Sequence, residues 1–446
     1  MMQAHMPSTL MGRSLVGLAF AILMLGCKPS GAQSESKRRP APKPTAEQLL
    51  AATQPGYSSP SGTRQECLGR LVFDAAESMQ WGIMKPGLWS GDRYRFTEKM
   101  PGKGDDLWVG NIQITVMAPA TQADIQSMAD EIDAKKDNGI FEYQKMIETR
   151  KFGISEANRL LNNPSQNVNG EDLSTYPAMI AKDMAEIAET ETRIANIQKD
   201  WHPLDPGIPD ALAYAAGPDL YAYVLREGRA YKFLSASGEG QPKFEERERA
   251  FLDLLKRFQF RKLYEVPSVP GICVPYGFIP DDGRLNVRLA VSLRYADRPG
   301  VIYTLGTSVV GEEGVNGPED SMLGAMGRAG AAGVVPGRDA QRMGPHKVKI
   351  GALEAHQGGV SLNVADQGKP AVRSYSVYTG YGGFAHSRVL PNITLDMRSF
   401  TREQEPTLEQ NPPPVEESMA RMDALLKSIR LRPTQPLMPE LVGVKP

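Results

Sequence analysis

Two stretches of the sequence repeat each other, and this repeat most constrains the fold. Residues 254–261 read Leu-Leu-Lys-Arg-Phe-Gln-Phe-Arg, and residues 425–432 read Leu-Leu-Lys-Ser-Ile-Arg-Leu-Arg. Each stretch ends a predicted helix, and each helix closes a region that begins with a cysteine leading into a strand, at Cys67 and at Cys273. A duplicated layout predicts two related α+β domains in tandem. The alternative is that Leu-Leu-Lys is a common helix ending.

Hydrophobic periodicity places the elements of the first region. Residues 68–74 and 112–117 are predicted strands, because apolar and polar side chains alternate in the second of them. Helical periodicity predicts helices over 121–150, 174–199 and 244–258. Two apolar runs on either side of Glu227-Gly228 predict a β-hairpin.

The second region begins near Pro270 and is richer in strand signals. Residues 285–294 alternate most strictly, which predicts a strand with one buried face and one wetter face. Further strands are expected at 301–309, 347–356, 372–378 and 392–397, and a last helix at 416–429. The glycine-rich stretch 311–344 is predicted to be a long surface loop. The expected fold is therefore α+β, with two antiparallel-sheet-plus-helix domains.

An N-terminal apolar run predicts secretion. Residues 15–26 are apolar and too short to cross a bilayer core of roughly 30 Å, so they fit the central part of a signal peptide. Met24-Leu-Gly-Cys27 resembles the bacterial lipobox, in which the cysteine is lipidated. A plain signal peptide with a chance cysteine is the alternative. Lys28, rather than an aspartate, after the cysteine favours the outer membrane as the destination.

Composition divides the chain into five segments. With 446 residues the chain exceeds one ordinary domain. The segments are a signal peptide at 1–26, a Pro/Ser-rich tether at 27–64, domains at 65–266 and 267–432, and a tail at 433–446. The tether composition is too poor in apolar residues to form a core, and a short helix is considered within it near residues 46–52. The formal net charge is only −1, so no nucleic-acid partner is expected.

If Cys27 carries lipid, two cysteines remain. Cys67 and Cys273 cannot complete a structural zinc site, and their spacing is not that of a Cys-x-x-Cys redox pair. In a secreted protein a single disulfide between them is favoured, and two separate buried thiols are the alternative. A bond would tie the two domains together at the starts of their first strands.

The sequence lacks the catalytic signatures that can be tested. It has no Gly-x-Ser-x-Gly elbow and no Gly-x-x-x-x-Gly-Lys-Ser/Thr phosphate loop. No histidine pair has metal-ligand spacing, and His346 and His356 are expected far apart at the two ends of one strand. The pair Asp281-Asp282 before Gly283 predicts a turn rather than a catalytic pair. We therefore expect no metal, no cofactor and no enzymatic activity.

Several of these segments together resemble a known family. Cys67-Leu-Gly-Arg-Leu-Val-Phe-Asp with Met79-Gln-Trp, and Cys273-Val-Pro-Tyr-Gly-Phe-Ile, resemble the openings of the two domains of Tle-cognate immunity proteins, group four. Gly380-Tyr-Gly-Gly-Phe and Pro391-Asn-Ile-Thr-Leu-Asp-Met resemble closing strands of the second domain. The resemblance extends over residues 65–432.

The resemblance implies a periplasmic, lipid-anchored inhibitor rather than an enzyme. Its partner would be a type VI secretion phospholipase or lipase toxin, which two domains would grip as a clamp and whose active-site entrance they would block. A different envelope lipoprotein with a scaffolding role, and a secreted hydrolase with an unrecognised site, are the alternatives. The candidate exposed aromatic anchors for the toxin are Trp89, Trp108, Tyr378 and Tyr381, and the favoured alternative for each is a position in the core or at the rim of the interface.

Overall fold

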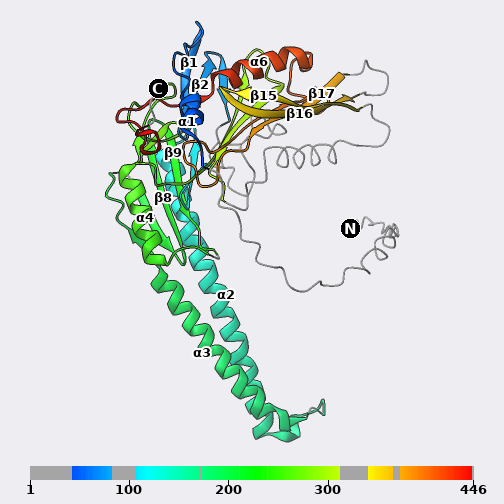
Figure 1. Ribbon diagram of the computed structural model, residues 1–446. Coiled ribbons are helices and arrows are strands. Elements are labelled where there is room, and N and C mark those ends of the chain that lie inside the picture. The colour runs from blue at the N-terminus through cyan, green and yellow to red at the C-terminus, as the bar shows by residue number, and fades with distance from the viewer. Residues whose placement is uncertain are drawn as a thin grey trace, which may run out of the picture. The chain divides into compact units, whose positions relative to one another are not determined.

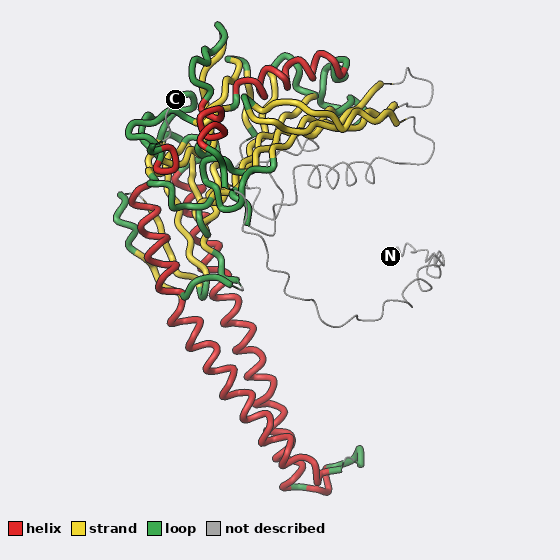
Figure 2. Tube along the Cα trace, in the orientation of Figure 1, coloured by secondary structure: helices red, strands yellow, loops and turns green. Residues whose placement is uncertain are grey.

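Antiparallel strands and five helices build the described part of the chain (Figures 1 and 2). The computed structural model describes residues 43–82, 107–170, 172–209, 211–238, 240–311, 340–364 and 372–443. The helices are α1 (Ala46–Thr53), α2 (Gln122–Asn162), α3 (Tyr176–Asp200), α4 (Phe244–Arg257) and α6 (Val415–Ser428). The mixture of antiparallel sheets and helices is the α+β class expected from the sequence.

The strands fall into two groups, one on each side of the predicted domain boundary in the sequence. The earlier strands are β1 (Thr63–Leu68), β2 (Leu71–Ala76), β3 (Met79–Trp81), β4 (Leu107–Val109), β5 (Ile112–Met117), β6 (Trp201–Leu204), β7 (Ala211–Ala216), β8 (Asp219–Arg226), β9 (Arg229–Ser235) and β10 (Gln259–Phe260). The later strands are β11 (Gly271–Val274), β12 (Gly277–Pro280), β13 (Val287–Tyr295), β14 (Val301–Ser308), β15 (Ala340–Ile350), β16 (Leu353–Val364), β17 (Val372–Tyr381), β18 (Asn392–Ser399) and β19 (Arg430–Leu431).

One large antiparallel sheet contains strands from both predicted domains. Over the described ranges it has 13 strands, in the order β15-β16-β17-β18-β14-β13-β4-β5-β9-β8-β7-β6, with β3 also paired to β13. The two sets of strands meet where β13 pairs β4, with Leu289 opposite Leu107. The sheet is thus continuous across the predicted boundary at 266/267, and that boundary stays a prediction.

Strand β13, which the strictest alternation predicted, lies at the middle of this sheet. Its odd-numbered residues from Val287 to Leu293 are buried in the main core. On the other face Arg288 is exposed, but Ala290 and Ser292 are buried as well. The expected wetter face therefore exists only at one end, because neighbouring strands and loops cover the remainder.

Two small three-stranded sheets repeat one construction. In the first, the hairpin β1–β2 is extended by β19, which follows α6; in the second, the hairpin β11–β12 is extended by β10, which follows α4. Each hairpin begins with a cysteine strand and receives the closing strand of the other region. The predicted strand over 68–74 is thus a hairpin that turns at Gly69-Arg70. We call this reciprocal arrangement the strand exchange.

Helices α4 and α6 lie in the same core, and α2 covers the opposite face of the earlier strands. Phe251 and Leu255 of α4 and Met422 and Leu425 of α6 belong to one hydrophobic cluster with the main sheet. The first turns of α2 pack into a second cluster with Tyr223 and other side chains of β7 to β9. Successive residues of a strand point to opposite faces, so these clusters are the two sides of the sheet.

Helices α2 and α3 form a long hairpin that continues past the strands (Figure 1). Helix α2 has 41 residues, which corresponds to about 60 Å at 1.5 Å per residue, and it runs past the predicted end at residue 150. The two helices meet along buried Ile147 and Ile187, and Arg150 forms an ion pair with Asp183 at 2.8 Å. No described helix is long and apolar enough to cross a membrane.

Part of the predicted tether is packed onto the folded chain. Helix α1 lies within residues 27–64, begins with a Thr45 capping box, and buries Leu49 and Ala52 in the main core. The Nε2 atom of Gln54 donates to the backbone carbonyl of Ile429 at 2.8 Å. The short helix considered near residues 46–52 is thus present, and it adds two side chains to the main core rather than forming a core within the tether.

The strand predicted over 347–356 is two strands. Residues 351–352 form the tight turn between β15 and β16. Gly351 has a φ of 59°, and an added Cβ would lie 2.2 Å from the carbonyl oxygen of Ile429. The predicted loop 311–344 lies largely outside the described residues, but its last five residues belong to β15.

Candidate functional site

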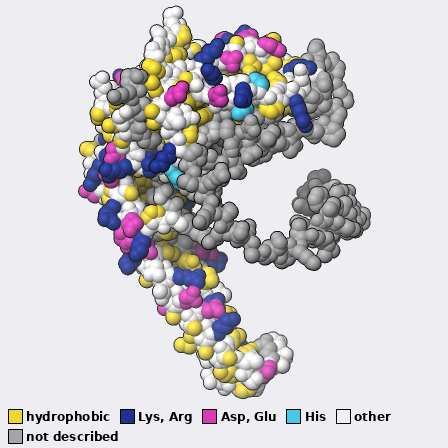
Figure 3. All heavy atoms as spheres, in the orientation of Figure 1, with side chains coloured by type: hydrophobic (Ala, Val, Ile, Leu, Met, Phe, Trp, Pro, Cys, Tyr) yellow, Lys and Arg dark blue, Asp and Glu magenta, His cyan; other side chains and the backbone are white. Residues whose placement is uncertain are grey.

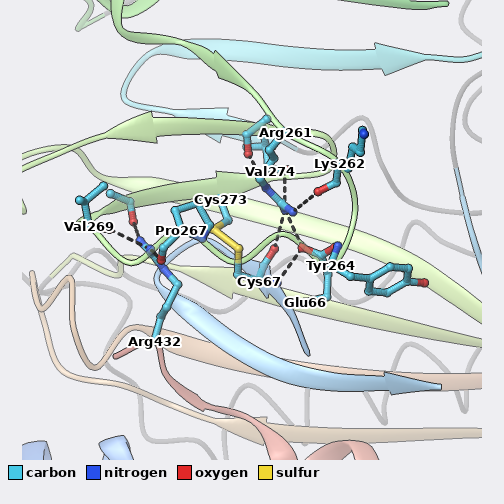
Figure 4. Close-up of a disulfide and its surroundings, with 12 residues drawn as sticks. Glu66, Cys67, Arg261, Lys262, Tyr264, Pro267, Val269, Cys273, Val274 and Arg432 are labelled. Carbon is cyan, nitrogen blue, oxygen red and sulfur yellow. Dashed lines mark hydrogen bonds and ion pairs between the residues drawn. A yellow bond between two sulfur atoms is a disulfide. The ribbon is translucent and has the colours of Figure 1, made fainter. Parts of the chain in front are cut away.

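The structure brings the two predicted cysteines together (Figure 4). Cys67 and Cys273 form a disulfide with Sγ atoms 2.11 Å and Cα atoms 5.7 Å apart, and both side chains are buried. Backbone hydrogen bonds of 2.8 Å run in both directions between Gly69 and Cys273. The disulfide therefore joins the two cysteine hairpins side by side. Cys27, the predicted lipidation site, lies outside the described residues.

Arg261, the last residue of the first repeated stretch, is buried beside this disulfide (Figure 4). One terminal nitrogen lies 2.6 Å from a carboxylate oxygen of Glu66, and the guanidinium also donates to the carbonyls of Val274 and Gly277 at 3.1 Å. Glu66 is fully buried and accepts the backbone N–H groups of Cys67 and Tyr264. The charged pair is thus hydrogen-bonded on both sides, as a buried ion pair requires.

Arg432, the last residue of the second repeated stretch, has an equivalent position with different partners. Its guanidinium donates to the carbonyls of Pro267, Val269 and Gly271, at 2.8 Å and 2.7 Å for the last two. Only 1% of its side chain is exposed, and it lies over the Phe278 ring. Burial, with some repulsion from neighbouring arginines, lowers the pKa of Arg432 to about 10.

A third buried arginine binds the predicted Asp-Asp-Gly turn. Arg70 forms an ion pair with Asp281 and donates to the carbonyl of Leu285 at 3.0 Å. Asp281 also accepts the backbone N–H groups of Gly283 and Leu285, so it shapes the turn. A carboxylate that is fully engaged in this way holds backbone in place and does not face a substrate.

Histidines 346 and 356 lie close together, which corrects the sequence prediction. In the β15–β16 hairpin His346 pairs with Gln357 and Lys347 pairs with His356, so the two histidines are neighbours along the hairpin with side chains on opposite faces of the sheet. The prediction was wrong because the turn at Gly351 folds one expected strand back on itself. Across the described ranges no three His, Cys, Asp or Glu side chains are placed to hold a metal ion.

The three candidate aromatic anchors within the described residues are half-buried, as the favoured alternative for them expected. Trp108 is half-buried, and the Arg288 guanidinium lies 5.2 Å from its ring centre. Tyr378 is also half-buried, and burial raises the pKa of half-buried Tyr381 to about 12. Trp89 lies outside the described residues. The sequence showed that these residues are aromatic, but the neighbours that cover them come from other strands.

Exposed apolar side chains occur instead on the α2–α3 hairpin (Figure 3). Phe141 and Phe152 of α2 are 59% and 69% exposed, and Met184 of α3 is 61% exposed. The two phenylalanines are 11 residues apart, about three helical turns, so they share a face that points away from the buried stripe. The helical periodicity contained this signal, because neither residue falls on the stripe of Ile125, Met128 and Ile132.

Titratable groups near the hairpin do not form an active-site arrangement. Residues 122–200 contain 15 acidic and 9 basic side chains. Ion pairs there between exposed partners, such as Arg193 and Glu189 at 2.6 Å, contribute little to stability. The excess of negative charge also disfavours adsorption of this hairpin to anionic lipid.

Comparison with protein families shows what the part of the chain with the later strands is similar to. Residues 265–434 match the family model described as the Tle cognate immunity protein 4 C-terminal domain. This part of the chain is similar to that family. The matched region, which we call the immunity domain, runs from just before β11 to just after β19 and contains Cys273, Asp281 and Arg432. The family resemblance seen in the sequence is thereby confirmed for this part of the chain.

Three solved structures of low sequence identity are similar to this chain. The immunity protein TplEi of the T6SS from Pseudomonas aeruginosa, complexed with an "L" peptide, is 16% identical, with a TM-score of 0.48, over 84% of this chain and 100% of that one. Apo TplEi has a TM-score of 0.46 at 16% identity, over 84% and 98%. A Tle4–Tli4 complex gives the same TM-score and identity over 84% and 100%. No curated protein matches the chain.

Proposed function

We propose that this chain is an immunity protein that binds and inhibits a type VI secretion phospholipase or lipase effector. The observation that carries the proposal is the match of residues 265–434 to the Tle cognate immunity protein 4 domain. Inhibition would be physical, by covering the entrance to the active site of the effector. A surface that is already rigid loses little conformational entropy on binding, which favours tight inhibition.

The buried contacts between the two cysteine hairpins support this mechanism. The disulfide, the Arg261–Glu66 pair and the Arg70–Asp281 pair all join residues that are about 200 positions apart in the chain. These contacts hold the earlier strands and the immunity domain in one arrangement. Two parts that are fixed in this way could contact an effector together, as the clamp expected from the family resemblance requires.

We also propose that the protein acts in the periplasm, anchored by lipid on Cys27 and directed to the outer membrane. The support is the apolar run at 15–26 and the lipobox-like Met24-Leu-Gly-Cys27. An anchor would concentrate the inhibitor at the membrane that a lipase attacks. Two or more acyl chains give durable anchoring, whereas one chain binds only marginally.

The test is co-expression in the periplasm with a Gly-x-Ser-x-Gly lipase encoded beside this gene. We expect the full-length chain to restore growth and to co-purify with the lipase. A version with Cys27→Ala and a cleavable export signal separates anchoring from binding, because it should still bind the purified lipase while no longer fractionating with membranes. Absence of both rescue and complex formation by the full-length chain would refute the immunity function.

A further inference from the structure

An apolar groove lies between α6 and the strands β15 to β17, inside the immunity domain. Its volume is about 400 Å³, within the range of roughly 300–1,000 Å³ that is usual for ligand pockets. Met343 and Val377 line it from the sheet, and Met419 and Ala420 line it from the helix. Methionine side chains adapt their shape to what they contact, so these walls suit an inserted apolar side chain.

Two carboxylates stand on the helix side of this groove. Glu416 and Asp423 are seven residues apart on α6, which is about two turns, so they share a face with Met419 between them. Both are exposed, and neither has an ion-pair partner among the described residues. The adjacent Glu417 differs, because it forms ion pairs with Arg298 and Arg421. Negative charge beside the groove is therefore available to a cation.

A β-bulge gives the groove its shape. The pairing of β15 with β16 shifts register between Met343 and His346, two residues that line the groove. Gly344 within the bulge has a φ of 77°, and an added Cβ would lie 2.7 Å from the carbonyl oxygen of Gln357. Buried Gln357 in turn donates to the Thr379 hydroxyl at 2.9 Å. The backbone pairing around the bulge thus fixes the shape of the groove. Bulges commonly occur beside functional sites, where they change the direction of a side chain.

We propose that this groove receives a segment of the effector in which a large apolar side chain is next to a lysine or arginine. The apolar side chain would lie between Met343, Val377 and Met419, and Glu416 and Asp423 would pair with the cation. A phospholipid is disfavoured as the occupant, because its phosphate would face two unpaired carboxylates. The inference rests on the proposed function and names a contact surface that the immunity domain contributes to the complex.

The experiment compares variants of the full chain in binding to the purified lipase encoded beside this gene. Ala420→Trp fills the groove from an exposed helical position, and Ala424→Trp places the same side chain on α6 outside the lining. We expect Ala420→Trp to weaken binding at least tenfold and Ala424→Trp to change it less than twofold. The double variant Glu416→Lys/Asp423→Lys should also weaken binding at least tenfold. Unfolding midpoints check that every variant is folded.

The outcomes separate this inference from the proposed function. If the wild-type chain does not bind the lipase, the proposed function fails. If wild type binds and both groove variants bind equally well, the groove has no role and only the present inference fails. A wild-type dimer that Ala420→Trp converts to monomer would assign the groove to a second copy and overturn the inference. If the wild-type chain floats with phosphatidylethanolamine–phosphatidylglycerol vesicles and Ala420→Trp abolishes this flotation, the groove binds lipid. That outcome would also overturn the inference.

Discussion

At the scale of single residues, buried arginines hold backbone carbonyls at the junction of the two regions. Arg261 and Arg432 end the two repeated stretches, and both direct their guanidinium groups at backbone carbonyls of the loops around β11 and β12. A guanidinium offers five donors in a fixed plane, so one side chain holds several carbonyls that no regular strand satisfies. The repeated arginine that the sequence revealed therefore has a structural role.

Replacement of Arg432 tests this role. Arg432→Met keeps an apolar side chain of similar length but leaves the carbonyls of Pro267, Val269 and Gly271 without their donor in a buried site. Each unsatisfied buried group costs about 1–3 kcal/mol, so we expect the free energy of unfolding to fall by about 3 kcal/mol in urea denaturation. Arg284→Met is the control, because that side chain is 86% exposed and its loss should change stability by less than about 0.5 kcal/mol. Equal stability of both variants would contradict the assignment.

Buried tyrosines predict loss of stability in alkali. Burial raises the pKa of Tyr57, Tyr375 and Tyr381 to about 12, and it also strongly raises the pKa of Tyr223, Tyr231 and Tyr303. Unfolded tyrosines ionise near pH 10, so above that pH the unfolded chain releases protons that the folded chain retains. The free energy of unfolding should therefore fall as the pH rises from about 10 to about 12. Urea midpoints measure the loss of stability, and tyrosinate absorbance measures the ionisation. Ionisation of all tyrosines near pH 10 without unfolding would contradict the prediction.

At the scale of elements, the α2–α3 hairpin depends on its own interface. Its distal turns contact few other elements, and its buried residues there include Ile147 of α2 and Ile187 of α3. A segment with little packing on the remaining structure opens at a lower free energy than the core. The hairpin should therefore melt as a separate unit.

The variant Ile147→Asp tests this separation. A buried carboxylate at the helix interface should reduce helical ellipticity and amide protection within residues 135–190, while the main sheet keeps its protection. The adjacent Met146→Asp is the control, because Met146 is 45% exposed and Ile147 only 7%. Hydrogen exchange resolves the two regions. Loss of protection throughout the chain in Ile147→Asp would show that the hairpin and the sheet unfold together.

Local signals explain which elements the sequence predicted. The hairpin β8–β9 was predicted because Glu227-Gly228 lies between two apolar runs, and both residues have the positive φ that such a turn needs. The strand exchange was not predictable, because β10 and β19 have two residues each and carry no periodicity. The groove beside α6 depends on strand register and on where a helix docks, and neither is encoded by neighbouring residues alone.

At the scale of the whole molecule, the disulfide links segments 206 positions apart. In the chain-entropy model a loop of this length gives about 5 kcal/mol of stabilisation. We expect Cys67→Ala/Cys273→Ala to lower the free energy of unfolding by up to that amount, and Cys27→Ala to leave it unchanged. Mass spectrometry of the mature protein without reductant should detect a peptide pair joined through Cys67 and Cys273. Two alkylated free thiols would contradict the bond.

The strand exchange also sets the order in which the molecule is completed in time. Val72 of β2 pairs with Arg430 of β19, which is synthesised 358 residues later. At about 5–20 residues per second, this interval is on the order of 20–70 s. The hairpin made first is thus the last to receive its third strand, and a chain that stops short of β19 keeps an open edge. A chain that lacks β19 is therefore distinguishable from one that contains it by that unpaired strand.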